Sequence, residues 1–297
     1  MRPSKIILPI LSLTLIPLLL PRAPGEAQTN AQRGAQVAGG GTVIFSLMKD
    51  IYGTFHMEPI VIISGGKYTA PPTEDEAGAK KFSDTYFRTG RQYRVVFGGG
   101  DAGSLTVQKY EKDQCLNLVA DVGAQTTARL GGEVQALAVS SDKIVSGLSL
   151  RRAPTEGERA SAVEVARAVY RQRGVGAALV RKMKTVNLTA TDVDRDSKFE
   201  LIGSFEIDAG NEVMHNLFII FEPTASEEYK AAWNWYQKGD ENGNEDRKLV
   251  DTFDLDGDGT AEVIAEGHTI ENHDYVIYKR QAGTWRPVYK GGGGGAC

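Results

Sequence analysis

The sequence predicts a mainly β protein that is rich in hairpins and has one intervening α-helix. Short runs of β-branched and aromatic residues recur between glycine and proline turn signals, a pattern typical of antiparallel sheets. One segment, near residue 155, has the signature of a helix start. The 297 residues are 41% hydrophobic and 24% charged, so the chain can bury a sizeable core.

The first 27 residues predict a signal peptide. Arg2 and Lys5 precede an apolar run of 15 residues, Ile6–Leu20, which is too short for a stable membrane span. Small residues at Gly25 and Ala27 indicate cleavage after Ala27. The mature protein is therefore expected to be secreted or periplasmic, and the polar, Gly-rich residues 28–41 are interpreted as a linker.

Charge and cysteine content exclude several classes of protein. The formal net charge of −4 argues against a nucleic-acid binder. Residues 28–190 carry 21 basic and 15 acidic side chains, whereas residues 191–297 carry 10 and 22. Two cysteines are too few for a disulfide-dense scaffold or a Cys-rich zinc fold. In an oxidising compartment Cys115 and Cys297 could form a disulfide, or both could remain thiols.

Residues 42–153 predict a β-rich N-terminal domain. Strand-like runs lie at 43–45, 60–63, 93–97, 104–107, 116–119 and 134–139. The glycine-rich segment 98–103 joins two of them and favours a hairpin turn, because the lysine and the helix of a phosphate-binding loop are missing. The polar segment Thr73–Lys81 predicts a loop.

Residues 154–184 predict a helical connector. Thr155 and Glu158 have the spacing of a capping box, in which each side chain accepts from the other residue's backbone. Apolar residues then recur on one face, and Gly174 marks the expected end of the helix.

Two acidic segments, 62 residues apart, repeat one spacing of carboxylates, at positions 1, 3, 5 and 9. Ca²⁺ takes about 6–8 oxygen ligands, which a curled loop of alternating aspartates can supply, and a backbone carbonyl at position 7 can add another. Clustered carboxylates repel one another unless a cation lies among them. The predicted ligands are Asp192, Asp194, Asp196, Glu200 and the carbonyl of Lys198 in the first segment, and Asp254, Asp256, Asp258, Glu262 and the carbonyl of Thr260 in the second.

The acidic segments are not EF-hands. Position 12, which should be a bidentate Glu, is Gly203 or Ala265, and a strand-like sequence follows. We therefore predict two calcium-loop hairpins. Gly259 at position 6 allows a sharp turn, whereas the first segment has Ser197 there.

Asp254–Ile264 (DLDGDGTAEVI) resembles the calcium loop of FG-GAP and VCBS-type repeats, which form propeller blades of about 60 residues. The resemblance covers about residues 186–290. It implies Ca²⁺ as the bound ion, and the same ligand positions in both segments. Residues 185–290 are therefore interpreted as a calcium-loop repeat region, followed by a Gly-rich tail at 291–297. Two repeats are too few blades for a closed propeller.

Other candidate sites favour packing or solvent exposure. The four histidines have no zinc-binding spacing. Arg88, Arg91 and Arg94 alternate with aromatic residues and could bind a glycan or a polyanion, but a solvated strand face is the simpler interpretation. Trp233 and Trp235 could stack on a sugar, yet core packing is commoner.

The sequence thus favours a secreted, non-catalytic, β-rich protein in which Ca²⁺ staples acidic hairpin loops. No catalytic residue is predicted, and the partner is unknown. Two alternatives remain at this point. One is an exported hydrolase whose site is assembled from separate loops, and the other is a glycan- or protein-binding module.

Overall fold

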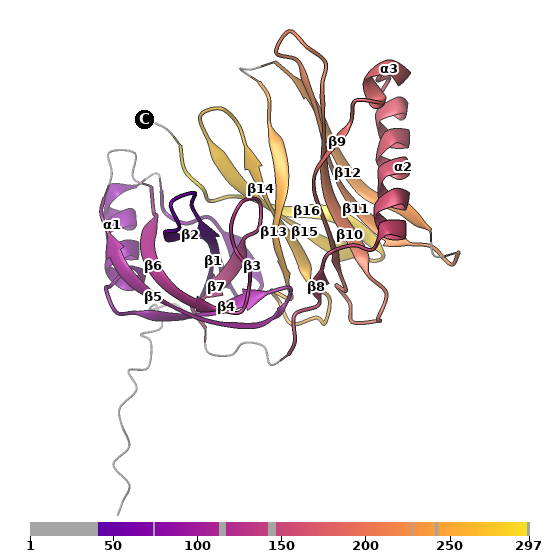
Figure 1. Ribbon diagram of the computed structural model, residues 1–297. Coiled ribbons are helices and arrows are strands. Elements are labelled where there is room, and N and C mark those ends of the chain that lie inside the picture. The colour runs from indigo at the N-terminus through magenta and orange to yellow at the C-terminus, as the bar shows by residue number, and fades with distance from the viewer. Residues whose placement is uncertain are drawn as a thin grey trace, which may run out of the picture. The chain divides into compact units, whose positions relative to one another are not determined.

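The computed structural model describes residues 41–73, 75–112, 117–141, 147–226, 228–240 and 243–295. These residues form antiparallel sheets with one main helix (Figure 1). Strands account for 52% of the structure and helices for 13%. The predicted mainly β, hairpin-rich fold is confirmed, and the sheets do not form a propeller.

The N-terminal part is a six-stranded barrel. The barrel closes because β1 pairs with β2 as well as with β7. A short additional strand, β3 (Lys67–Thr69), pairs with β2. In order around the barrel the strands are β1 (Thr42–Lys49), β7 (Ala136–Val139), β4 (Gln92–Phe97), β5 (Gly100–Tyr110), β6 (Ala120–Thr126) and β2 (Phe55–Ser64). The predicted hairpin across the glycine-rich segment is the β4–β5 turn.

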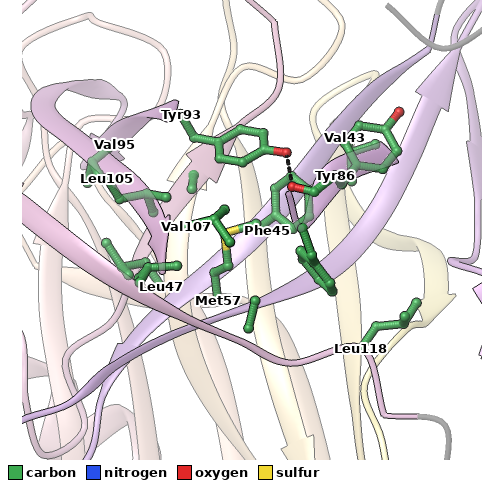
Figure 2. Close-up of a cluster of buried hydrophobic side chains, with 14 of the residues drawn as sticks. Val43, Phe45, Leu47, Met57, Tyr86, Tyr93, Val95, Leu105, Val107 and Leu118 are labelled. Carbon is green, nitrogen blue, oxygen red and sulfur yellow. Dashed lines mark hydrogen bonds between the residues drawn. The ribbon is translucent and has the colours of Figure 1, made fainter. Parts of the chain in front are cut away.

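Aliphatic and aromatic side chains together fill the barrel interior (Figure 2). The ring of Phe45 lies 5.2 Å from that of Tyr93 and 6.0 Å from that of Tyr86, centroid to centroid. The Tyr93 hydroxyl donates to the Tyr86 carbonyl at 2.6 Å, which satisfies a buried polar group.

The predicted loop Thr73–Lys81 is wrong, because most of it belongs to helix α1 (Glu76–Tyr86). Asp75 caps this helix by accepting from the amides of Ala77 and Gly78. The helix buries Phe82 and Tyr86 against the barrel core, a tertiary contact that the polar composition of the segment does not reveal. The strand expected at 116–119 begins later, at Ala120.

The C-terminal part consists of two antiparallel sheets that each contain a four-stranded meander. The five-stranded sheet comprises β8 (Arg151–Arg152), β9 (Lys184–Thr191), β10 (Glu200–Asp208), β11 (Met214–Pro223) and β12 (Tyr229–Gly239). The four-stranded sheet comprises β13 (Asp246–Phe253), β14 (Glu262–His268), β15 (His273–Gln281) and β16 (Thr284–Gly291).

Helix α2 (Glu156–Gln172) covers one face of the five-stranded sheet through Ala162, Ala166 and Tyr170. The predicted capping box of Thr155 and Glu158 is present. Glu158 also receives two hydrogen bonds of 2.7 Å from Arg152, which lower the pKa of its carboxyl to about 2. A single turn, α3 (Ala177–Val180), follows before β9.

The four-stranded sheet is buried on both faces. Successive side chains of a strand point to opposite sides of the sheet, so neighbouring residues pack in different interfaces. In β14, Val263 packs with the five-stranded sheet, and the next residue, Ile264, packs with the outer face of the barrel. In β15, Tyr278 likewise packs with the five-stranded sheet, and Ile277 packs with the outer face of the barrel. The continuous apolar runs of the sequence therefore reflect strands covered on two sides.

A buried polar network joins the barrel to the four-stranded sheet. Glu58 of β2 is 1% exposed and accepts from the Tyr275 hydroxyl at 2.8 Å, and it lies 2.7 Å from His273 Nε2. His268 stacks on His273 and pairs with Glu266 at 3.1 Å. Two histidine–carboxylate pairs thus lie at this interface.

The glycine-rich segment after β16 follows the protein surface closely. The Gly294 carbonyl accepts from the His273 amide at 3.0 Å, and Gly295 exchanges two hydrogen bonds of 3.2 Å with Asn117. A Cβ atom at Gly293 would lie 2.1 Å from the His273 carbonyl oxygen, so only glycine fits there.

Several predictions lie outside the described residues. They are the signal peptide 1–27, residues 28–40 of the linker, and both Cys115 and Cys297, for which a disulfide and two thiols are both open. Within the described ranges, no helix has the length and apolar character needed to cross a bilayer.

The histidine pairs predict a pH-dependent interface. The Glu266 hydrogen bond raises the pKa of His268, and although burial lowers the pKa of His273, the bond and charge of Glu58 raise it overall. A raised histidine pKa stabilises the fold fully below the unfolded value of about 6.5, and this stability is lost as the pH rises through the folded pKa.

We therefore expect the melting temperature to fall between about pH 6 and pH 8, and the fall to be smaller in His273→Asn. Differential scanning calorimetry across this range measures it. His215 is the control, because burial lowers its pKa and its contribution to stability is therefore lost as the pH falls. The His215→Asn variant should still show the fall in melting temperature between about pH 6 and pH 8. A wild-type melting temperature that is flat or rises would contradict the prediction.

Candidate metal loops

Each acidic segment is the connection of a β-hairpin, as predicted. Loop 1 (Asp192–Glu200) joins β9 to β10, and loop 2 (Asp254–Glu262) joins β13 to β14. Each loop is the first connection of a four-stranded meander.

The two loops have closely similar hydrogen-bond patterns, which differ in one donor to the position 1 carboxylate: the position 5 amide in loop 1 and the position 4 amide in loop 2. The carboxylate at position 1 accepts from two backbone amides inside the loop, at 3.0–3.1 Å in loop 1 and 2.8–3.0 Å in loop 2. The carboxylate at position 5 accepts from the amide at position 7. Glutamate at position 9 accepts from the amide at position 2, at 3.2 Å in loop 1 and 2.8 Å in loop 2. Each loop is therefore curled by its own carboxylates.

Positions 4 and 6 of both loops have a left-handed backbone. Loop 2 has glycine at both, Gly257 at φ 79° and Gly259 at φ 90°. Loop 1 has Arg195 at φ 60° and Ser197 at φ 68°. A residue with a Cβ atom pays roughly 1 kcal/mol or more for this conformation, so loop 1 is the more strained.

The structure brings together three of the four predicted carboxylates in each loop. Oxygens of Asp192, Asp194 and Glu200 lie within 4.8 Å of one another, as do oxygens of Asp254, Asp256 and Glu262. These are the groups within the described residues that could hold a metal ion.

The position 5 aspartates lie outside the triads. Asp196 pairs with Lys198 at 3.8 Å, and Asp258 pairs with Lys279 at 2.7 Å. The amides of Lys198 and Thr260 donate to these aspartates. The predicted ligand role of the Lys198 and Thr260 carbonyls stays a prediction.

Burial shifts the titration of both glutamates. It raises the pKa of Glu200 to about 7, although the Val193 amide opposes the shift, and it also raises the pKa of Glu262. The exposed Asp258 differs, because its hydrogen bond with Lys279 lowers the pKa of that carboxyl. A positive charge among these oxygens would favour their ionised form.

Two basic side chains from β15 reach the loops, and sequence reasoning missed both. Lys279 contacts Asp256, Asp258 and Glu262 of loop 2. Arg280 lies 2.9 Å from Asp194 of loop 1. The sequence did contain a signal, since Lys279 and Arg280 follow an apolar run in β15. A charge in a strand that is covered on both faces needs a partner, so two adjacent basic residues there indicate acidic groups nearby.

The loops lie side by side. The Ala261 amide donates to the Val193 carbonyl at 2.7 Å, and the hydroxyls of Thr191 and Thr252 lie 3.1 Å apart. A cavity of about 600 Å³ is lined by residues of both loops, including Asp192 and Asp254, and by barrel residues such as Gly98.

Buried polar contacts connect the strand before loop 2 both to β8 and to the barrel. Asp251, three residues before loop 2, is fully buried and accepts from the Gly98 amide at 2.9 Å and from Arg151 at 3.2 Å. Arg151 also donates to the Val250 carbonyl at 2.9 Å. The strand that enters loop 2 is therefore fixed against the β4–β5 turn.

The other candidate sites are occupied by packing. Arg91 lies over the rings of Tyr86 and Tyr93. Trp233 lies 4.3 Å from the Tyr278 ring, and Arg247 lies 4.1 Å from the Trp235 ring. The preferred interpretation, that the tryptophans serve core or sheet-edge packing, agrees with these contacts.

Comparisons of the chain with protein-family models, curated proteins and solved structures found no match. The likeness to FG-GAP and VCBS-type loops is thus carried by the loop motif alone.

The backbone of loop 2 predicts a specific cost of substitution. Gly259→Ala should lower the free energy of unfolding by about 1 kcal/mol, because the space around the new Cβ is open and only the left-handed backbone opposes it. Urea denaturation measures the change.

Gly157→Ala is the matched control, since its surroundings are also open but it lies in the first turn of α2. Alanine there should leave stability unchanged or raise it. Equal effects of the two substitutions would show that loop 2 does not hold the left-handed turn.

Proposed function

We propose that the protein is a non-catalytic calcium-binding protein in which Ca²⁺ binds in loop 1 and loop 2 and fixes the two hairpins. The observation that carries the proposal is the recurrence of one triad, from positions 1, 3 and 9, in both loops. The resemblance of loop 2 to FG-GAP and VCBS-type calcium loops supports it.

The donor set favours a hard cation. Each triad offers carboxylate oxygens alone, and calcium and magnesium prefer oxygen, whereas zinc and copper prefer nitrogen and sulfur. Calcium suits a loop better than magnesium does, because it accepts irregular geometry and a larger number of ligands.

The role we propose for the ion is structural. Loop 1 belongs to the five-stranded sheet and loop 2 to the four-stranded sheet, and a direct backbone hydrogen bond joins them. An ion that fixes either loop therefore also fixes the contact between the sheets. We also propose that residues 1–27 act as a signal peptide and export the protein. Extracellular calcium modules bind the ion with dissociation constants of roughly 10⁻⁴–10⁻³ M.

Calcium should raise the melting temperature of the mature protein, and EDTA should lower it. At an ion concentration of about 100 times the dissociation constant, one site contributes about 2.7 kcal/mol. Asp254→Asn with Asp256→Asn should remove the part due to loop 2, and Asp192→Asn with Asp194→Asn the part due to loop 1. Scanning calorimetry with and without chelator, together with metal content by mass spectrometry, measures this.

Asp208→Asn is the matched control, because Asp208 accepts from a turn amide in the β10–β11 connection and lies outside both loops. It should leave the calcium response intact. Wild-type protein that carries no calcium and melts identically with and without EDTA would refute the proposed function.

A further inference from the structure

Lys279 occupies the centre of loop 2. Its ammonium contacts a carboxylate oxygen of Asp256, and lies 2.7 Å from Asp258 Oδ2 and 3.0 Å from Glu262 Oε1. The contacts with Asp256 and Asp258 are hydrogen bonds, and Glu262 lies at ion-pair distance, so one ammonium faces three carboxylates. The side chain is 13% exposed, which means that it is held in place rather than extended into solvent.

The contacts of Lys279 coincide with the proposed metal ligands. Asp256 and Glu262 belong to the triad, and Asp258 is the carboxylate at position 5. Calcium requires its oxygens at about 2.3–2.6 Å, closer than an ammonium holds them. The ion and the ammonium therefore cannot share this cluster.

In the part of the chain that the structure describes, no basic side chain contacts three carboxylates of loop 1 as Lys279 does in loop 2. Arg280 contacts one carboxylate of loop 1, Asp194, and its Nε lies 3.3 Å from Glu222 of β11. The described contacts of Asp192 and Glu200 are to backbone amides of the loop rather than to Arg280. The two loops thus differ in the charge that the chain itself supplies.

We propose that Lys279 is an internal counterion that closes loop 2 in the metal-free protein and competes with calcium for it. The inference rests on the proposed function and adds its regulation. Calcium binding breaks the three ion pairs and exposes the ammonium to solvent, which lowers the affinity of loop 2 for calcium. When the ion is absent, the same ion pairs keep loop 2 in shape, so the metal-free protein stays folded.

The test isolates loop 2. In an Asp192→Asn, Asp194→Asn background, calcium binding is measured by isothermal titration calorimetry with and without Lys279→Met, which keeps the apolar stem and removes the charge. We expect Lys279→Met to bind calcium about tenfold more tightly or better, and to melt at a lower temperature without metal. Lys279→Gln serves as a second variant if Lys279→Met does not fold.

Lys290→Met is the matched control, because Lys290 pairs with Glu245 and Asp274, away from both loops. Its calcium affinity should equal that of the background. Equal affinities with and without Lys279 would overturn the inference and leave the proposed function intact. If the background binds no calcium either with or without Lys279, and wild-type protein binds none, the proposed function is refuted, and the competition with it.

Discussion

The fold depends on the burial of the four-stranded sheet on both faces. Its strands contribute Val263 and Tyr278 to one interface and Ile264 and Ile277 to the other. Burial of this kind provides most of the stability of a domain, at roughly 25 cal/mol per Å² of apolar surface. It also means that every charged group of the sheet must find a partner, because a buried charge without one is costly.

Several polar groups at this sheet meet that requirement within the fold. Asp251 pairs with Arg151 and accepts from the Gly98 amide, and Lys279 pairs with three carboxylates of loop 2. At the barrel contact, Glu58 accepts from the Tyr275 hydroxyl and lies 2.7 Å from His273 Nε2. These charges are thus paired inside the protein rather than left to bulk water.

Local signals in the sequence were enough for the parts of the structure that local chemistry determines. The aspartate spacing predicted both hairpin loops, and Thr155 and Glu158 predicted the start of α2, because these groups bond within a few residues of themselves. Helix α1 was missed, because its buried face is defined only by its contact with the barrel core. Closure of the barrel and the reach of Lys279 into loop 2 depend on contacts between distant segments, which no short pattern encodes.

Lys279 and Arg280 are consecutive residues of β15, and their side chains leave the strand in opposite directions, one toward each loop. A single strand therefore supplies a basic partner to both acidic loops, through two residues joined by one peptide unit. Under the proposed function, an ion that binds at either loop acts on a contact made by this same strand.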